Sequence, residues 1–178
     1  TQSYQVFGGH VPAIDAVNYS SLQAAIDALP PTGGVLRIPA GTFEINEPLR
    51  ISQEDVLIEG SGTATHIKNV NTEGKPAIEI DNPKRKEVPR SVLWRVSLQN
   101  LRITGNEKSG DGIIAHHTNE IFLHGVTVSY HGKSGIVLDN CYEDPRICDC
   151  LFTYNKAAGV RLIACHDIVV VGNQFEEN

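Results

Sequence analysis

Three side chains with complementary acid–base chemistry recur at nearly constant spacing in the second half of the 178-residue chain: His116, Asp139 and Arg161. A histidine beside a carboxylate acts as an oriented general base, and an arginine neutralises a sugar carboxylate or stabilises an enolate-like intermediate. The three residues are 23 and 22 positions apart. They can therefore cooperate only if the fold brings distant segments of the chain together.

The segment from Val96 to the C-terminus is a repeat that would bring them together. A turn-type residue followed by alternating apolar side chains occurs at spacings of 25, 24 and 23 residues, beginning at Asn100, Gly125, Asp149 and Gly172. A glycine followed by a short apolar run recurs between them with the same period, at Gly112, Gly135 and Gly159. A repeat of about 24 residues with alternating apolar positions predicts a solenoid of short stacked strands.

The period assigns equivalent residues of successive coils to columns about 4.8 Å apart. One outward column holds Ile114, Val137 and Arg161, and the other holds His116, Asp139 and Ile163. The spacing therefore predicts that His116 and Asp139 face solvent side by side, with Arg161 diagonal to Asp139 on the next coil. We expect these three to be catalytic. The alternative is a surface ion pair along a strand ladder, where opposite charges are favourable neighbours.

Five further residues are candidates for a site on the surface of the solenoid. Tyr130 and Tyr154 share a turn position. We expect Tyr130 to donate a proton if its face of the solenoid meets the face of His116, and Tyr154 to bind substrate. The alternative is that the two rings stack only on each other. His124 is outward in a column with Gln99, Cys148 and Val171. Lys133 and Arg85, the latter in the charged loop 81–91, are the remaining substrate-binding candidates. The alternative is that both are only exposed, solvated residues.

Other polar residues have a structural interpretation. Asn106, Asn155 and Asn178 occupy one turn position in three coils, with His131 in the remaining place, which predicts a ladder of amides bonded to the backbone. Cys141 and Cys165 each follow their coil's glycine by six residues. Stacked strands keep their Cβ vectors parallel, so a reduced, buried pair is favoured over a disulfide.

Composition limits the classes of function. The net charge is −6 and gives no reason to expect a nucleic acid partner, and no apolar run approaches the roughly 20 residues that span a membrane. No cysteine pattern typical of zinc is present, so we expect no metal or other cofactor. The repeat stops at Asn178 without a cap. We therefore expect either a piece of a longer protein, truncated at the C-terminal end, or a homo-oligomer that covers the open end.

The first half of the chain supplies the opening of the same domain. Residues 1–18, with Gly8-Gly9 and Pro12, are expected to be mostly irregular, and residues 20–29 to form a helix with one apolar face. Short strands are expected at 35–39, 43–45, 49–51, 56–59, 66–68 and 77–80. The prediction is one domain over residues 1–178, with irregular early coils at 35–95 and regular coils at 96–178.

The residues from 20 to 67 resemble a known group. Leu22-Gln23-Ala24-Ala25-Ile26-Asp27-Ala28, then Gly33-Gly34-Val35-Leu36-Arg37-Ile38-Pro39-Ala40-Gly41-Thr42-Phe43, look like the opening of the pectate-lyase-like superfamily of right-handed parallel β-helix proteins. Ile58-Glu59-Gly60-Ser61-Gly62-Thr63 resembles the second coil of that group. The resemblance implies an all-β, single-stranded right-handed parallel β-helix with an N-terminal capping α-helix, and carbohydrate as the usual ligand.

The resemblance does not select a reaction, because fold alone does not fix activity. Mannuronan epimerases carry Asp-Pro-His where this chain has Asp144-Pro145-Arg146, and the Asp-Asp pair and Gly-His-Gly of polygalacturonases are missing; the nearest fragment is Gly110-Asp111-Gly112. Calcium enters as a cofactor only through resemblance to calcium-dependent pectate lyases, and no outward carboxylate cluster to hold it is found in the sequence.

These observations predict a secreted or cell-surface protein that acts on an acidic polysaccharide by β-elimination or epimerisation. One alternative is a non-catalytic polysaccharide-binding or tailspike-like adhesion module. The other is a glycoside hydrolase whose catalytic coils lie outside this segment, because hydrolysis uses two carboxylates facing one bond and no outward column is seen to pair them.

Overall fold

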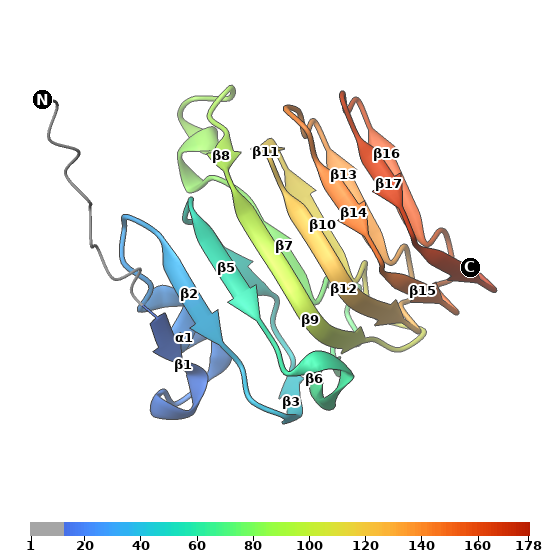
Figure 1. Ribbon diagram of the computed structural model, residues 1–178. Coiled ribbons are helices and arrows are strands. Elements are labelled where there is room, and N and C mark those ends of the chain that lie inside the picture. The colour runs from blue at the N-terminus through green and yellow to red at the C-terminus, as the bar shows by residue number, and fades with distance from the viewer. Residues whose placement is uncertain (1–12) are drawn as a thin grey trace, which may run out of the picture.

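A computed structural model describes residues 13–178 as a parallel β-solenoid (Figure 1). Every pair of hydrogen-bonded strands is parallel, so each coil adds its strands to those of the coil before. The expectation of an irregular N-terminus concerns, in part, residues 1–12, which lie outside the described residues. Within 13–18, strand β1 (Ala13–Asp15) pairs with β2 and a 3-10 turn follows at Ala16–Asn18.

The strands form three sheets. The large sheet contains β1, β2 (Gly34–Arg37), β3 (Gly41–Ile45), β5 (Val56–Glu59), β6 (Thr65–Asn69), β9 (Val96–Thr104), β12 (Phe122–Ser129), β14 (Arg146–Cys148), β15 (Leu151–Thr153), β17 (Val169–Val171) and β18 (Gln174–Glu176). The five-stranded sheet contains β4 (Leu49–Ile51), β7 (Ile78–Ile80), β10 (Ile113–His116), β13 (Ile136–Asp139) and β16 (Val160–Ile163). The short sheet pairs β8 (Leu93–Trp94) with β11 (Thr118–Asn119).

Helix α1 (Leu22–Asp27) lies at the N-terminal end of the solenoid beside β1 and β2 (Figure 1). It begins after Ser21, whose hydroxyl accepts a hydrogen bond from the Ala24 amide at 3.1 Å, as an N-cap does. Leu22 and Ile26 are buried in the main apolar cluster. The helix is shorter than the expected 20–29, and it covers the apolar end of the coils as expected.

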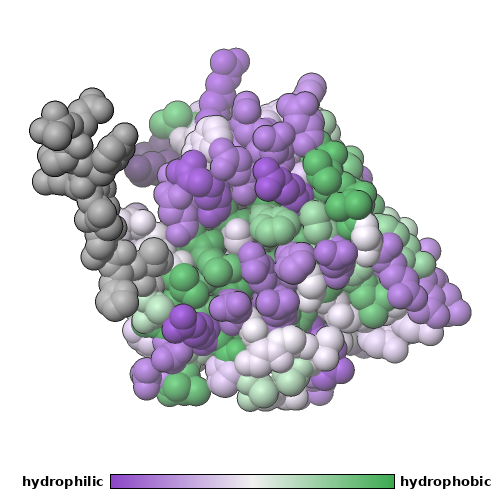
Figure 2. Space-filling view, in the orientation of Figure 1, coloured by the Kyte–Doolittle hydropathy of each residue, from purple (hydrophilic) through white to green (hydrophobic). Residues whose placement is uncertain are grey.

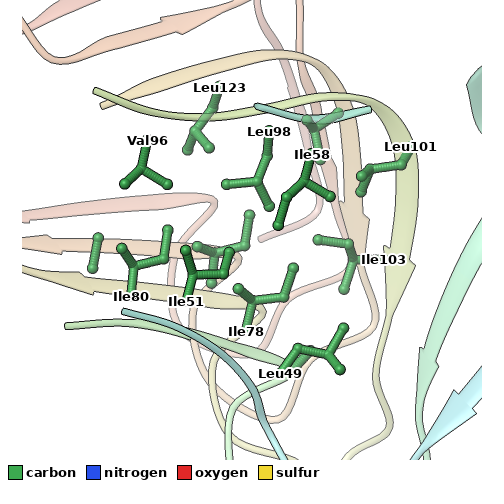
Figure 3. Close-up of a cluster of buried hydrophobic side chains, with 14 of the residues drawn as sticks. Leu49, Ile51, Ile58, Ile78, Ile80, Val96, Leu98, Leu101, Ile103 and Leu123 are labelled. Carbon is green, nitrogen blue, oxygen red and sulfur yellow. The ribbon is translucent and has the colours of Figure 1, made fainter. Parts of the chain in front are cut away.

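The core is a set of apolar columns that run the length of the solenoid (Figure 3). Figure 3 shows side chains of the large sheet and of the five-stranded sheet pointing toward one another. In the five-stranded sheet the register is Leu49, Ile78, Ile113, Ile136, Val160. The columns expected from the repeat are therefore confirmed, and they extend back into the early coils, which the sequence did not align.

The polar ladder has the expected members. Asn155 is buried, donates its side-chain amide to the Val128 carbonyl at 3.1 Å and to Asn178 Oδ1 at 2.8 Å, and accepts the amide of His131. Asn106 bonds the carbonyls of Asn69 and Asn71 in the same way. All four cysteines are free, including the stacked Cys141 and Cys165.

The last coil leaves inward positions uncovered. Leu162, Val170 and Phe175 continue the buried columns of Leu138, Ile147 and Phe152, and are 44%, 42% and 50% exposed. Figure 2 shows apolar side chains gathered over the strands toward the C-terminal end. Within residues 13–178, no helix has the length and apolar character needed to cross a membrane.

Candidate functional site

The His116–Asp139 pair lies at the carboxyl ends of β10 and β13. The strands pair in the expected register, Ile113 with Ile136 through His116 with Asp139. The inward neighbours Ala115 and Leu138 are fully buried, which fixes the two alternate side chains on the outer face. His116 Nδ1 is 3.1 Å from Asp139 Oδ2, and both side chains are about one quarter exposed, at 22% and 27%.

Asp139 is itself held by a hydrogen-bond chain. Asn140 donates its amide to Asp139 Oδ1 at 2.7 Å, and the Tyr142 hydroxyl donates to Asn140 Oδ1 at 3.0 Å. The Tyr142 ring lies 5.2 Å from the ring of His166 on the next coil. With one carboxylate oxygen occupied by Asn140, the other is directed at His116. Sequence columns alone do not indicate Asn140 and Tyr142, because both follow the strand in a turn.

Asp81 and Arg85 join this row from an earlier coil. Ile80 pairs with Ala115 at the last position of the β7–β10 register, and Asp81 is the next residue of the chain. Arg85 Nε and Nη2 donate to the two Asp81 oxygens, both at 2.8 Å. These bonds raise the pKa of the Arg85 guanidinium above its usual value, and Asp139 adds to that effect from a greater distance. Asp81, His116, Asp139 and Arg85 therefore form one charged cluster.

This cluster corrects one sequence inference, that no outward column pairs carboxylates. Asp81 directly follows the strand paired with β10 on one side, and Asp139 ends the strand paired with β10 on the other. The loop after Asp81 makes the relation between Asp81 and His116 difficult to recognise from the sequence. It contains the 3-10 turn η3 (Pro83–Lys86) and β8, and it lengthens the step between equivalent positions to 35 residues from Ile80 to Ala115. A search that allowed one long loop per coil would have found it.

Arg161 lies on the same face, as expected, but apart from the His116–Asp139 contact. It pairs with Val137 on β16 and is exposed, and among residues 13–178 no carboxylate lies within 4 Å of its guanidinium. Val137, which the register places on the outer face, is only 4% exposed. The outer face of the five-stranded sheet therefore combines the charged cluster with a packed apolar strip and a free guanidinium.

The structure does not bring Tyr130 to His116. Tyr130 precedes β13 and lies in the turn at the amino ends of the five-stranded sheet, whereas His116 lies at the carboxyl ends. Its ring stacks on Tyr154, with centroids 5.1 Å apart and planes 7° from parallel. Lys133 is exposed in the same turn as Tyr130. The condition attached to Tyr130 as a proton donor, that the two faces meet, is not met by this geometry.

His124 lies on the large sheet, away from the His116 cluster. Its column is Gln99, His124, Cys148 and Val171, as expected. The imidazole stacks on Phe122 with centroids 5.7 Å apart, and its Nε2 is 3.5 Å from Asp149 Oδ2. In residues 13–178, no group of three or more histidine, cysteine or acidic side chains is arranged to hold a metal ion.

Comparisons with known proteins agree with this architecture. A family model described as "Right handed beta helix region" matches residues 42–178. Among solved structures, similarity is found to ORF18 of Geobacillus virus E2, with a TM-score of 0.76, 18% identity, and coverage of 91% of this chain and 39% of that one. The comparison with curated protein sequences found no match.

Two further similar structures have names that specify a carbohydrate activity. One is the A-module of the mannuronan C-5 epimerase AlgE4 of Azotobacter vinelandii, with a TM-score of 0.60, 16% identity, and coverage of 91% of this chain and 56% of that one. The other is a mutant pectin methylesterase in complex with a hexasaccharide, with a TM-score of 0.53, 14% identity, and coverage of 76% and 51%. The chain spans about half of these proteins or less.

Proposed function

The chain belongs to the right-handed beta helix family, and from that premise we propose that it processes an acidic extracellular polysaccharide at the His116 cluster by β-elimination or epimerisation. The observation that carries the proposal is the contact of His116 Nδ1 with Asp139 Oδ2 at 3.1 Å on an outer solenoid face. Polysaccharide as the substrate class is supported by the two structural neighbours named for mannuronan and pectin.

Both reactions begin by removing the proton on the carbon next to the sugar carboxylate. With the Nδ1 proton shared with Asp139, His116 Nε2 carries the lone pair that accepts this proton. The electron pair left on carbon delocalises into the carboxylate as an enolate. In β-elimination it then forms a carbon–carbon double bond as the neighbouring sugar oxygen leaves with a proton. In epimerisation, carbon takes a proton on the opposite face.

The enolate requires positive charge close by. Arg85 uses Nε and Nη2 for Asp81, which leaves Nη1 to donate to a substrate carboxylate. Arg161, on the same face, supplies a second guanidinium further along the solenoid. Tyr142, whose hydroxyl belongs to the Asp139 hydrogen-bond chain, replaces Tyr130 as the candidate proton donor.

The test is incubation with alginate, pectate and polygalacturonate, followed by the absorbance of unsaturated product and by NMR of the polymer. His116→Ala is expected to abolish the reaction. His66→Ala is the matched control, because His66 lies on the outer face of the large sheet, bonded to Thr104 Oγ1 at 2.7 Å. Full activity in the His116→Ala protein would remove the site assignment.

A second candidate is binding without catalysis, as in a surface adhesion module. The exposed Tyr130–Tyr154 stack, on which a sugar ring could lie, supports it. A trimer by sedimentation velocity, together with no product from any of the three polymers, would favour this candidate over the first.

Hydrolysis is supported by one feature, the carboxylates of Asp81 and Asp139 at the ends of the strands on either side of β10. Paired carboxylates facing one bond are the usual equipment for glycoside hydrolysis. However, Arg85 already binds both oxygens of Asp81, which leaves that carboxylate poorly placed to exchange a proton. New reducing ends without unsaturated product would identify hydrolysis and contradict the elimination proposal.

A further inference from the structure

A hollow of about 570 Å³ lies at the end of the coils opposite the His116 cluster. Its lining residues come from the turns that follow β9, β12, β15 and β18. Its walls are Gly105, Asn106, Glu107, Tyr130, Tyr154, Asn155, Lys156 and Glu177. The volume falls within the range of about 300–1,000 Å³ that is typical of small-molecule sites.

The hollow lies beside a stacked column of two tyrosines and a glycine. The Gly105 amide bonds the Ser129 carbonyl, and the Tyr130 amide bonds the Thr153 carbonyl, so Gly105, Tyr130 and Tyr154 occupy one column. Tyr154 covers one face of the Tyr130 ring at 5.1 Å. The preceding member of the column is Gly105, and Tyr130 remains 54% exposed, so part of its ring surface is open to a ligand.

Few polar groups around the ring are available to a ligand. The Asn106 and Asn155 amides are already bonded within the ladder. The remaining charged groups are the Glu107 carboxylate, the Lys156 ammonium 3.0 Å from it, and the Glu177 carboxylate. The rim therefore offers strong acceptors and one donor, with an excess of negative charge.

Tyr154 is affected by that negative charge. The Glu177 carboxylate, and to a smaller extent that of Glu176, raises the pKa of the Tyr154 hydroxyl above its usual value. A ligand that carries its own carboxylate would be repelled by the same groups. The hydroxyl groups of an uncharged sugar ring would donate to the carboxylates of the rim and accept from its ammonium, and the ring would pack an apolar face on Tyr130.

We propose that the Tyr130 hollow is a subsite for an uncharged hexopyranose unit, stacked on the exposed surface of Tyr130 with its hydroxyl groups bonded to Glu107 and Lys156. The choice of a sugar rests on the proposed polysaccharide function. The position of the subsite and its preference for an uncharged ring rest on the exposed aromatic surface of Tyr130, the hollow beside it and the charges of the rim.

Saturation-transfer NMR with cellohexaose, maltohexaose and hexagalacturonate tests this. At least one neutral hexasaccharide is expected to receive saturation on its ring protons, and hexagalacturonate to bind more weakly. Tyr130→Ala is expected to raise the Kd for the neutral sugar about tenfold. Tyr130→Phe, which keeps the ring, is expected to bind as the wild type does. Thermal unfolding of each variant confirms that it is folded.

Three results would overturn the proposal. The first is that neither neutral hexasaccharide receives saturation. The second is that hexagalacturonate binds as tightly as the neutral sugar or more tightly. The third is that Tyr130→Ala binds the neutral sugar with an unchanged Kd. The His116→Ala protein separates this proposal from the catalytic one. It is expected to lose product formation and to keep neutral-sugar binding, so each proposal can fail while the other stands.

Discussion

At the scale of single residues, the geometry of His116 depends on Asp139, which fixes the imidazole through Nδ1. Asp139→Asn removes the negative charge that would stabilise the imidazolium formed when Nε2 accepts a proton. We expect kcat on the acidic polymer to fall by roughly 10²-fold or more, with KM little changed. Initial rates over a range of polymer concentrations measure both. A rise in KM at constant kcat would instead indicate that Asp139 only helps to bind substrate.

His131 makes a separate prediction about pH and stability. Burial lowers the pKa of this imidazole from 6.5 to about 4. The unfolded chain therefore binds a proton at pH values where the folded chain does not, so this stabilisation is complete above the unfolded pKa and is lost as pH falls from about 6.5 through 4. The free energy of unfolding should fall by roughly 2 kcal/mol between pH 7 and pH 5 from this group alone.

His131→Asn isolates that contribution, because asparagine occupies the equivalent turn positions of the neighbouring coils. Urea unfolding of both proteins at pH 7 and pH 5 is the measurement. The variant is expected to lose less stability on acidification than the wild type. An equal loss in the two proteins would show that other groups produce the pH dependence.

Part of the residue-scale account could be predicted from sequence. The 24-residue period placed His116 beside Asp139 because strand register is exact to one residue when one face is buried. The period could not indicate Asn140 or Tyr142, because their hydrogen bonds depend on turn geometry. It also could not show that Tyr130 lies away from His116, because the columns give no distance between the two ends of a strand.

At the scale of elements, the turns between the sheets depend on the asparagine ladder. Asn155→Ala would leave the Val128 carbonyl and the His131 amide without their buried partner. We expect a loss of about 1–3 kcal/mol in the free energy of unfolding. The neighbouring Lys156→Ala, on an exposed side chain, is the control and should stay within about 0.5 kcal/mol of wild type. Equal effects in a urea titration would argue against the ladder as a source of stability.

The arrangement of the elements was only partly predictable from the sequence. The helix, the early strands and the regular coils were recoverable because each has its own apolar period. The loop between β7 and β8 broke the register, so the strand that ends before Asp81 could not be aligned with β10 from the sequence. Arg85, selected only as part of a basic loop, turned out to be held at the cluster by two bonds to Asp81.

At the scale of the whole molecule, the last coil presents core positions to solvent. Val170 and Phe175 continue columns that are fully buried one coil earlier. Apolar surface of this kind favours association, so we expect this 178-residue chain to self-associate with rising concentration. Val170→Lys is expected to weaken that association, whereas Val88→Lys, in the exposed loop, should not. Sedimentation velocity distinguishes the two, and a wild-type monomer at all concentrations would contradict the expectation.

The arrangement of the two candidate sites is also a property of the whole molecule. His116 and the Tyr130 hollow lie at opposite ends of the strands of the five-stranded sheet, and each gathers residues from several coils. A long polymer that carries both acidic and uncharged units, rather than a single sugar, is the ligand that could contact both. This is why oligosaccharides are the appropriate probes for the hollow and polymers for the reaction.

The central claim, that His116 removes a proton from an acidic sugar, is tested most directly by NMR of alginate, pectate and polygalacturonate incubated with the protein in D₂O. Elimination and epimerisation both consume the proton on the carbon next to the carboxylate. We predict that its signal disappears from at least one polymer with the wild-type protein and persists with His116→Ala. An intact signal in all three polymers with the wild type, or its loss at an equal rate with His116→Ala, would contradict the account.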